Sequence, residues 1–151
     1  MKLSKNFSLE ELSKSDTAVR REINNVPSED IITNLQELVD NVLQPIRDRM
    51  GPVVISSGYR SPQLNTAIGG SKTSDHCLGM AADIEVLGMD NKFVAEYIRD
   101  NMLFTQLILE FYRDGVPDSG WVHVSYDPKD LKKQVLRADK VGGKTHYSTG
   151  F

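Results

Sequence analysis

The sequence predicts an α+β domain with a small, mainly antiparallel sheet packed on helices. Two observations support this class. A long stretch with helical apolar spacing comes early, and several short stretches in which apolar and polar residues alternate follow it, joined by short connections. Only one further helical stretch separates these predicted strands, whereas a doubly wound parallel sheet would need a crossover helix between most of its strands.

Length and composition indicate a single domain over residues 1–151. The chain is 39% hydrophobic, with no internal repeat and no linker-like stretch. We expect a core over about residues 7–140 and a loose C-terminal tail, because residues 142–150 are rich in glycine, serine and threonine. A single cysteine excludes an internal disulfide framework.

Charge and hydropathy exclude some partners. A net charge of -3 provides no field for phosphate backbones, so no nucleic acid partner is expected. No apolar run is long enough for a membrane span. The first twelve residues are polar and charged, which predicts synthesis in the cytoplasm without a signal peptide.

Capping residues and apolar spacing mark the predicted helices. Ser8 starts a segment of the capping-box form, so a short helix should begin there. The main packing helix is expected from about Ile31 to Ile46 and should end near Gly51. A short helix should start at Ser61-Pro62, within an otherwise loop-like segment, and an amphipathic helix is expected at about 90–101.

The predicted strands are short and place polar residues on one face. We expect them at residues 53–56, 80–86, 106–111, 121–126 and 134–138. Alternation assigns to the apolar face Ala82, Ile84, Val86, Leu107, Leu109, Phe111, Val122 and Val124. It leaves Asp83, Glu110 and His123 together on the opposite, open face.

His76, Asp83 and His123 form a candidate zinc site on that open face. His76 lies seven residues before Asp83, at the end of a loop that enters the strand, so its ring can turn back over the same face. Two imidazoles and one carboxylate suit an open zinc site that keeps water in the fourth position. Each residue taken alone fits an ordinary solvated side chain. Cys77 is a weaker alternative ligand because it adjoins His76, and His146, in the tail, is assigned no role.

Three segments carry a family resemblance. They read Ser-Ser-Gly-Tyr-Arg-Ser at 56–61, Ser-Asp-His-Cys-Leu-Gly-Met-Ala-Ala-Asp at 74–83, and Trp-Val-His-Val-Ser at 121–125. Together they resemble the zinc D-alanyl-D-alanine carboxypeptidases and related peptidoglycan metallopeptidases, especially the compact phage-encoded type. The resemblance implies a hedgehog/DD-peptidase-like fold, zinc (Zn2+) on His76, Asp83 and His123, and Arg60 as the group that binds the substrate carboxylate or the developing oxyanion.

The catalytic base is where the sequence departs from this resemblance. Many relatives have Glu or Asp three residues before the last histidine ligand, where this chain has Gly120. Glu110 is the first candidate to take a proton from the attacking water and pass it to the leaving amine. Asp118 is the second candidate. Either carboxylate could instead hold a histidine ring through its second nitrogen.

The resemblance also implies residues that line a substrate cleft. Ser74 is expected to donate a hydrogen bond to the substrate or to order its loop. Trp121 and Tyr59 are expected either to contact the substrate or to pack against neighbouring side chains.

The expected function is therefore a hydrolase: a zinc metallopeptidase that cuts the peptidoglycan stem peptide. The bond is either the terminal D-alanyl-D-alanine bond, as in a carboxypeptidase, or an internal stem or cross-bridge bond. The resemblance further implies a monomeric phage or prophage product, an endolysin or a virion component, which acts in cell wall degradation after release. The alternative is a non-catalytic zinc-containing wall-binding or virion structural module on the same fold, which Gly120 keeps open.

Overall fold

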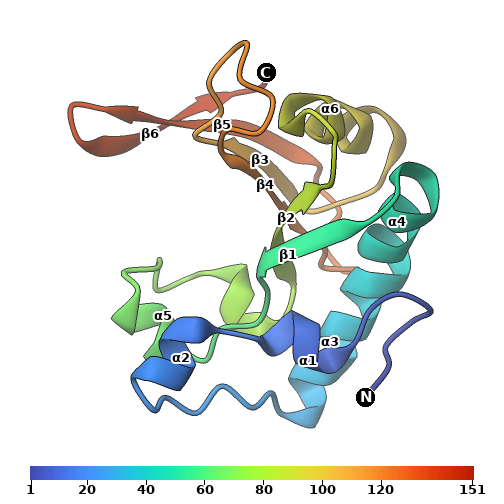
Figure 1. Ribbon diagram of the computed structural model, residues 1–151, viewed down its shortest axis with the longest axis vertical. Coiled ribbons are helices and arrows are strands. Elements are labelled where there is room, and N and C mark those ends of the chain that lie inside the picture. Colours follow the sequence, from blue (N-terminus) through green and yellow to red (C-terminus); the bar gives the residue numbers. More distant parts are fainter.

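A six-stranded sheet in the order β1-β2-β4-β3-β5-β6 organises the computed structural model, which describes all 151 residues (Figure 1). The strands are β1 (Val53–Ser57), β2 (Ala81–Val86), β3 (Gln106–Glu110), β4 (Trp121–Ser125), β5 (Gln134–Val141) and β6 (Lys144–Thr149). All neighbours pair antiparallel except β3 and β5, which are parallel. The predicted α+β class with a mainly antiparallel sheet is confirmed.

Eight helical segments precede or connect the strands. They are α1 (Leu9–Ser13), α2 (Asp16–Arg20), α3 (Glu29–Leu38), the π turn η1 (Val39–Leu43), α4 (Gln44–Met50), α5 (Pro62–Ala67), the 3₁₀ turn η2 (Asp75–Leu78) and α6 (Asn91–Asn101). Ser8 caps α1 and Ser61 caps α5, as their sequences predict. The short segments α2 and η2 are not among the helices that the sequence predicts. No helix combines the length and the apolar character that crossing a bilayer requires.

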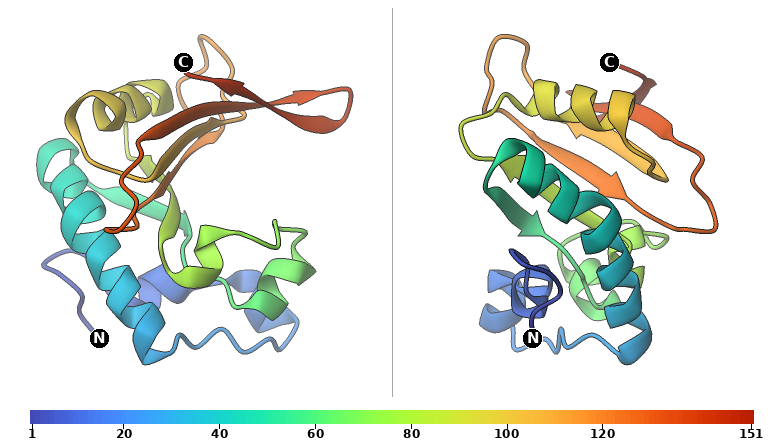
Figure 2. Two further views of the ribbon diagram at one scale, coloured as in Figure 1. Left: turned by 180° about the vertical axis from the view of Figure 1, so that it is seen from behind. Right: turned by 90° about the vertical axis from the view of Figure 1, so that its right-hand side faces the viewer.

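The long helical stretch and α6 cover the same face of the sheet. Segments α3, η1 and α4 follow one another without a break over residues 29–50, so the predicted packing helix is present with a π turn in its middle. Figure 2, right, shows α4 and α6 in front of the strands. The core between the helices and the sheet contains fully buried residues of both layers: Leu35, Leu38, Val42 and Ile46 from the helical stretch, and Ala82, Ile84, Leu107, Leu109, Val122 and Val124 from the strands. The opposite face of the sheet is thereby left free for polar side chains.

The C-terminal segment differs from the loose tail that its composition predicts. Residues 144–149 form β6, which pairs along β5 from Val141↔Lys144 to Leu136↔Thr149. Between them Gly142 and Gly143 both adopt positive φ angles, 58° and 78°, as a two-residue hairpin turn requires. Two adjacent glycines are typical of a flexible end, whereas here they form a tight turn. The strand before the turn, β5, extends three residues beyond its predicted end at 138.

Phe111 differs from the predicted strand pattern. Alternation assigns it to the apolar core, but its φ of 55° ends β3 at Glu110 and turns its side chain to the other face. There the Phe111 ring packs on Trp121, with ring centroids 5.4 Å apart. Tyr112 is buried in the core instead.

Candidate metal and active site

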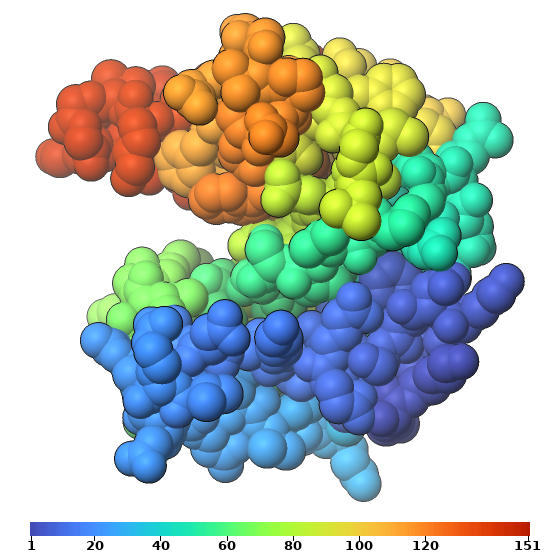
Figure 3. All heavy atoms as spheres, in the orientation of Figure 1, coloured from blue at the N-terminus to red at the C-terminus, as the bar shows by residue number.

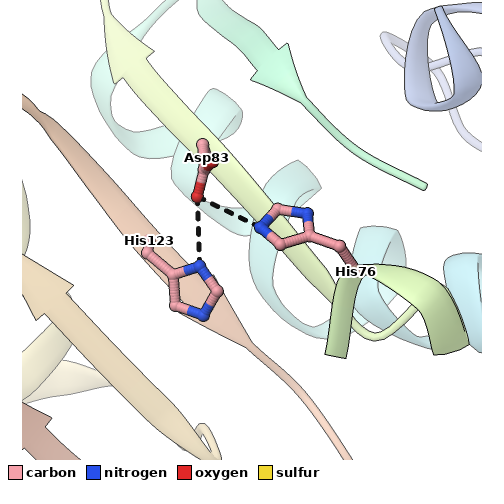
Figure 4. Close-up of side chains that lie close together, drawn as sticks. All are labelled: His76, Asp83 and His123. Atoms are coloured by element: carbon pink, nitrogen blue, oxygen red, sulfur yellow. Dashed lines mark hydrogen bonds and ion pairs between the residues drawn. The ribbon is translucent and has the colours of Figure 1, made fainter. Parts of the chain in front are cut away.

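Three side chains from separate elements meet on the open face of the sheet (Figure 4). Asp83 on β2 and His123 on β4 are direct partners across the strand pair, and His76 reaches them from η2. Asp83 Oδ1 lies 3.0 Å from His123 Nδ1 and 3.3 Å from His76 Nε2. The ligand atoms of all three lie within 4.8 Å of one another, so the structure brings the sequence-predicted metal ligands together.

His76 is held with one nitrogen directed into the site. Ser74 caps η2 by accepting a hydrogen bond from the His76 backbone, and the His76 Nδ1–H donates to the Gly58 carbonyl at 2.8 Å. Gly58 itself lies against α1, where a side chain would overlap the Leu12 carbonyl oxygen. The bond to Gly58 leaves Nε2 as the only ring nitrogen of His76 free to bind a metal.

The donor set fits a metal cation. With its Nδ1–H donated to the Gly58 carbonyl, His76 turns Nε2 toward the Asp83 carboxylate, and a cation between them would accept a lone pair from each. The observed 3.0 Å and 3.3 Å are close to the roughly 3.4 Å that separates two donors on a tetrahedral ion with bonds of about 2.1 Å. Two imidazoles and one carboxylate are also the donor types that zinc prefers.

Electrostatics favour a charged Asp83. Burial alone would raise its pKa, but the hydrogen bonds from His123 and His76 outweigh burial and hold the pKa well below its usual range. For His123, burial would lower the pKa, yet the hydrogen bond to Asp83 and nearby carboxylates raise it. Asp83 is therefore ionised over the whole physiological range and available as a metal ligand.

Glu110 lies on the same face, in the same cavity as His76, Asp83 and His123, which together form the candidate metal-binding group. Burial raises its pKa, and the negative charge of Asp83 raises it further. Its carboxylate accepts a hydrogen bond from the Trp121 indole N–H at 2.7 Å, which fixes the direction of both side chains. A half-buried carboxyl with a raised pKa and a fixed orientation suits a general acid and base.

Neither Asp118, the second candidate base, nor position 120 provides an acidic side chain in the cleft. Asp118 is exposed in the loop before β4 and does not line the cavity at the metal-binding group. Gly120 has a φ of 63°, and a side chain there would overlap the Glu110 carbonyl oxygen. The backbone at position 120 therefore has no room for an acidic side chain.

The predicted substrate-binding residues divide between two cavities. Arg60, Ser74 and Trp121 line the cavity that contains the metal-binding group. Arg60 Nη2 lies 3.5 Å from Ser74 Oγ, and Arg60 Nε is buried without a hydrogen-bond partner. Tyr59, by contrast, is only 7% exposed, packs in the core and faces a second cavity beside α2.

The cavity around the metal-binding group is a cleft of about 820 Å³ with two walls. Figure 3 shows it as the hollow between the β5–β6 hairpin and the segment around residues 60–75. The hairpin wall carries Leu136, Lys140, Thr145 and Tyr147, none of which the sequence singled out. The two adjacent glycines at 142–143 are the sequence signal that could have revealed this hairpin.

Comparison with known protein families gives a match over most of the chain. A sequence model of the family described as Peptidase M15 matches residues 5–125, which is most of the chain. The matched part includes η2, β2 and β4, which carry the metal-binding group, and it ends where β4 ends. No curated protein matches this sequence.

Proposed function

The chain belongs to the peptidase M15 family of metallopeptidases, and we propose that it is a zinc enzyme that hydrolyses peptide bonds of bacterial peptidoglycan. The observation that carries this proposal is the shared position of Asp83 Oδ1 between two histidine nitrogens, next to a carboxyl of raised pKa. His76 Nε2, Asp83 Oδ1 and His123 Nδ1 would hold the zinc. When bound, zinc supplies a Lewis acid for the peptide carbonyl and lowers the pKa of water to about 7.

Glu110 moves the proton in the proposed reaction. Its carboxylate takes a proton from the attacking water as the bond from oxygen to the carbonyl carbon forms. It then delivers that proton to the nitrogen of the leaving amine as the C–N bond breaks. Trp121 holds the carboxylate in place through its indole N–H, so that the accepting oxygen stays directed into the cleft.

Arg60 and Ser74 bind the substrate in this proposal. The Arg60 side chain lines the cleft, and its planar, permanently charged guanidinium suits a substrate carboxylate or a developing oxyanion. Ser74 orders the same wall, since its hydroxyl lies next to Arg60 and caps the turn that carries His76.

The biological setting is part of the same proposal. We propose a monomeric phage or prophage enzyme, made in the cytoplasm, that reaches the cell wall at lysis or as part of a virion. The likeness of residues 56–61, 74–83 and 121–125 to the compact phage-encoded type supports this setting.

Incubation with purified peptidoglycan tests the activity. Wall material from several chemistries is treated with the protein, with and without a zinc chelator, and the released fragments are identified by mass spectrometry. We expect release of D-alanine or of new stem-peptide ends that stops on chelation and returns with zinc. The His123→Ala variant, which loses a metal ligand, is the inactive control.

Bound zinc without any released fragment would contradict the peptidase proposal. Zinc content is therefore measured on the same sample by elemental analysis. A zinc-loaded protein that binds peptidoglycan and cuts none of the walls would instead be the non-catalytic wall-binding or virion module.

A further inference from the structure

We propose that Lys140, Thr145 and Tyr147 on the β5–β6 hairpin form a subsite that binds a second carboxylate of the peptide substrate, across the cleft from Arg60. This inference rests on the proposed function and adds the substrate class: peptides that carry a free carboxylate a few residues from the bond that is cut. The three residues line the same cavity as the metal-binding group.

Strand register places the hairpin residues on the face that carries Glu110. Glu110 is opposite Ala138 in the β3–β5 pair, and Ala138 is opposite Tyr147 in the β5–β6 pair. Lys140 lies two residues after Ala138 and is opposite Thr145. Directly opposite residues, and residues two apart on a strand, project from the same face. All three side chains therefore project on the side of the sheet where the reaction is proposed to occur.

The same register sets the distance to Glu110, the proposed base. Two strand spacings of about 4.8 Å separate the backbones of β3 and β6, roughly 10 Å in all. An extended peptide covers that distance in about three residues. The subsite would thus contact a residue near the scissile bond rather than the bond itself, so that the hairpin contributes to substrate choice and binding.

The hairpin wall presents an uncompensated positive charge. Lys140 forms no ion pair, and its ammonium lies over the Phe111 ring at 5.5 Å from the ring centroid. Lys132, which also lines the cavity, has only Asp130 at 3.8 Å. Three carboxylates line the cleft. Asp83 and Glu110 are assigned to the metal and to the proton transfer in the proposed function. Asp75 lies on η2 and forms no ion pair with Lys140 or Lys132. Lys140 therefore lacks an anionic partner within the protein, and an anion of the substrate can provide one.

The donors of this wall suit a carboxylate in particular. The Lys140 ammonium, the Thr145 hydroxyl and the Tyr147 phenol can all donate hydrogen bonds, and Lys140 cannot accept one. The Phe111 ring helps to hold the Lys140 ammonium in place, because the ring is itself packed on Trp121. A carboxylate accepts at both oxygens and can bind two or more of these donors at once.

The hairpin lies outside the part of the chain that matches the family model. The match covers 5–125, whereas β5 and β6 span 134–149. The proposed subsite is therefore on a different segment from the candidate metal ligands and Glu110, and this suits a role in substrate preference.

The test combines one variant, one matched control and two substrates. Lys140→Gln is compared with Lys144→Gln, an exposed lysine of the same hairpin that does not line the cleft. Each protein is given a soluble stem peptide with a free internal carboxylate and the same peptide with that carboxylate amidated. We expect Lys140→Gln to raise KM for the free-carboxylate peptide about tenfold with kcat unchanged, since a charge-assisted hydrogen bond is lost.

The amidated peptide and a second variant show whether the hairpin binds the carboxylate itself. Amidation of the peptide should raise KM of the wild-type protein by a similar factor. For Lys140→Gln, the KM values for the free and the amidated peptide should be the same. Tyr147→Phe should raise KM about threefold for the free-carboxylate peptide only. Equal KM values for Lys140→Gln and Lys144→Gln on both peptides would overturn the subsite.

A binding measurement keeps this test independent of turnover. Calorimetric titration of the Glu110→Gln protein with each peptide should show the same preference for the free carboxylate, removed by a second substitution of Lys140. If no wall or peptide is cut, the proposed activity fails, and this titration alone decides the subsite. No difference in Kd between the two peptides would then overturn it.

Discussion

Two carboxylates on one face of the sheet illustrate how single residues acquire different roles. Asp83 and Glu110 are both partly buried on the open face, yet the pKa of Asp83 is lowered and that of Glu110 is raised. Asp83 Oδ1 lies 3.0 Å from His123 Nδ1 and 3.3 Å from His76 Nε2, whereas Glu110 has one neutral donor, Trp121, and the repulsion of Asp83. Carboxyl groups whose pKa values are pushed apart in this way are suited to separate tasks, here metal binding and proton transfer.

Replacing Glu110 by glutamine should abolish hydrolysis and leave the metal bound. We expect kcat to fall by about 10²–10⁴-fold, because an amide cannot accept the proton from water. Steady-state kinetics measure the loss, and elemental analysis should show the same zinc content as the wild-type protein. In the wild-type protein the base must be ionised, so kcat/KM should fall as pH decreases through the raised pKa of Glu110.

The matched variant for this experiment is Asp118→Asn. Asp118 is exposed and lies outside the cleft. The Asp118→Asn substitution should therefore leave both kcat and the fall of kcat/KM at low pH unchanged. A rate for Glu110→Gln equal to that of the wild-type protein would remove Glu110 from the mechanism and return Asp118 to consideration.

The approach to β4 shows a constraint at the scale of an element. The chain turns back after β3 and enters β4 at Gly120, close to the backbone of Glu110 and Phe111. Only glycine combines the positive φ with that close approach. The turn brings Trp121 opposite Glu110, so the geometry that positions the proposed base excludes an acid at position 120.

Alanine at position 120 should therefore destabilise the protein strongly. We expect Gly120→Ala to lower the free energy of unfolding by at least about 3 kcal/mol, because a strained φ is combined with overlap of backbone atoms. Gly115→Ala is the control: Gly115 has a φ of 83° with open space around it, so only the conformational cost of about 1 kcal/mol applies. Urea unfolding measures both. Similar losses for the two variants would show that the overlap is relieved.

At the scale of the whole molecule, one metal ion at the candidate site would connect parts of the chain that are distant in sequence. Helices α3, α4 and α6 pack on one face of the sheet and leave the other open. On that open face His76, Asp83 and His123 come from η2, β2 and β4, and η2 is further tied through Gly58 to the segment after β1. A metal bound only by the folded chain would stabilise this whole arrangement.

Zinc should accordingly raise the melting temperature. At a free zinc concentration about 100 times Kd, the free energy of unfolding should increase by about 2.7 kcal/mol. For a chain of this size that corresponds to an increase in Tm of about 5–10 °C. Differential scanning calorimetry with zinc and after chelation measures the shift. His123→Ala should show no shift, whereas His146→Ala, an exposed histidine on β6, should keep it. A shift that survives His123→Ala would place the metal elsewhere.

The sequence by itself determined the class of fold and the candidate metal ligands. Helical spacing over 31–46 and alternation around Asp83, Glu110 and His123 are local patterns, and each is produced by the burial of one face. The resemblance to zinc peptidases in residues 56–61, 74–83 and 121–125 indicated the same three ligands that the structure brings together.

Only the tertiary structure decided how the cleft is built. The exclusion of an acid at position 120, the turn of Phe111 away from the core and the position of Tyr59 in the core depend on backbone approaches between distant segments. The β5–β6 hairpin became a wall of the cleft because β5 pairs with β3, a contact between residues far apart in sequence. Local patterns carry little information about such contacts, because a strand's neighbours are chosen by the packing of the whole sheet.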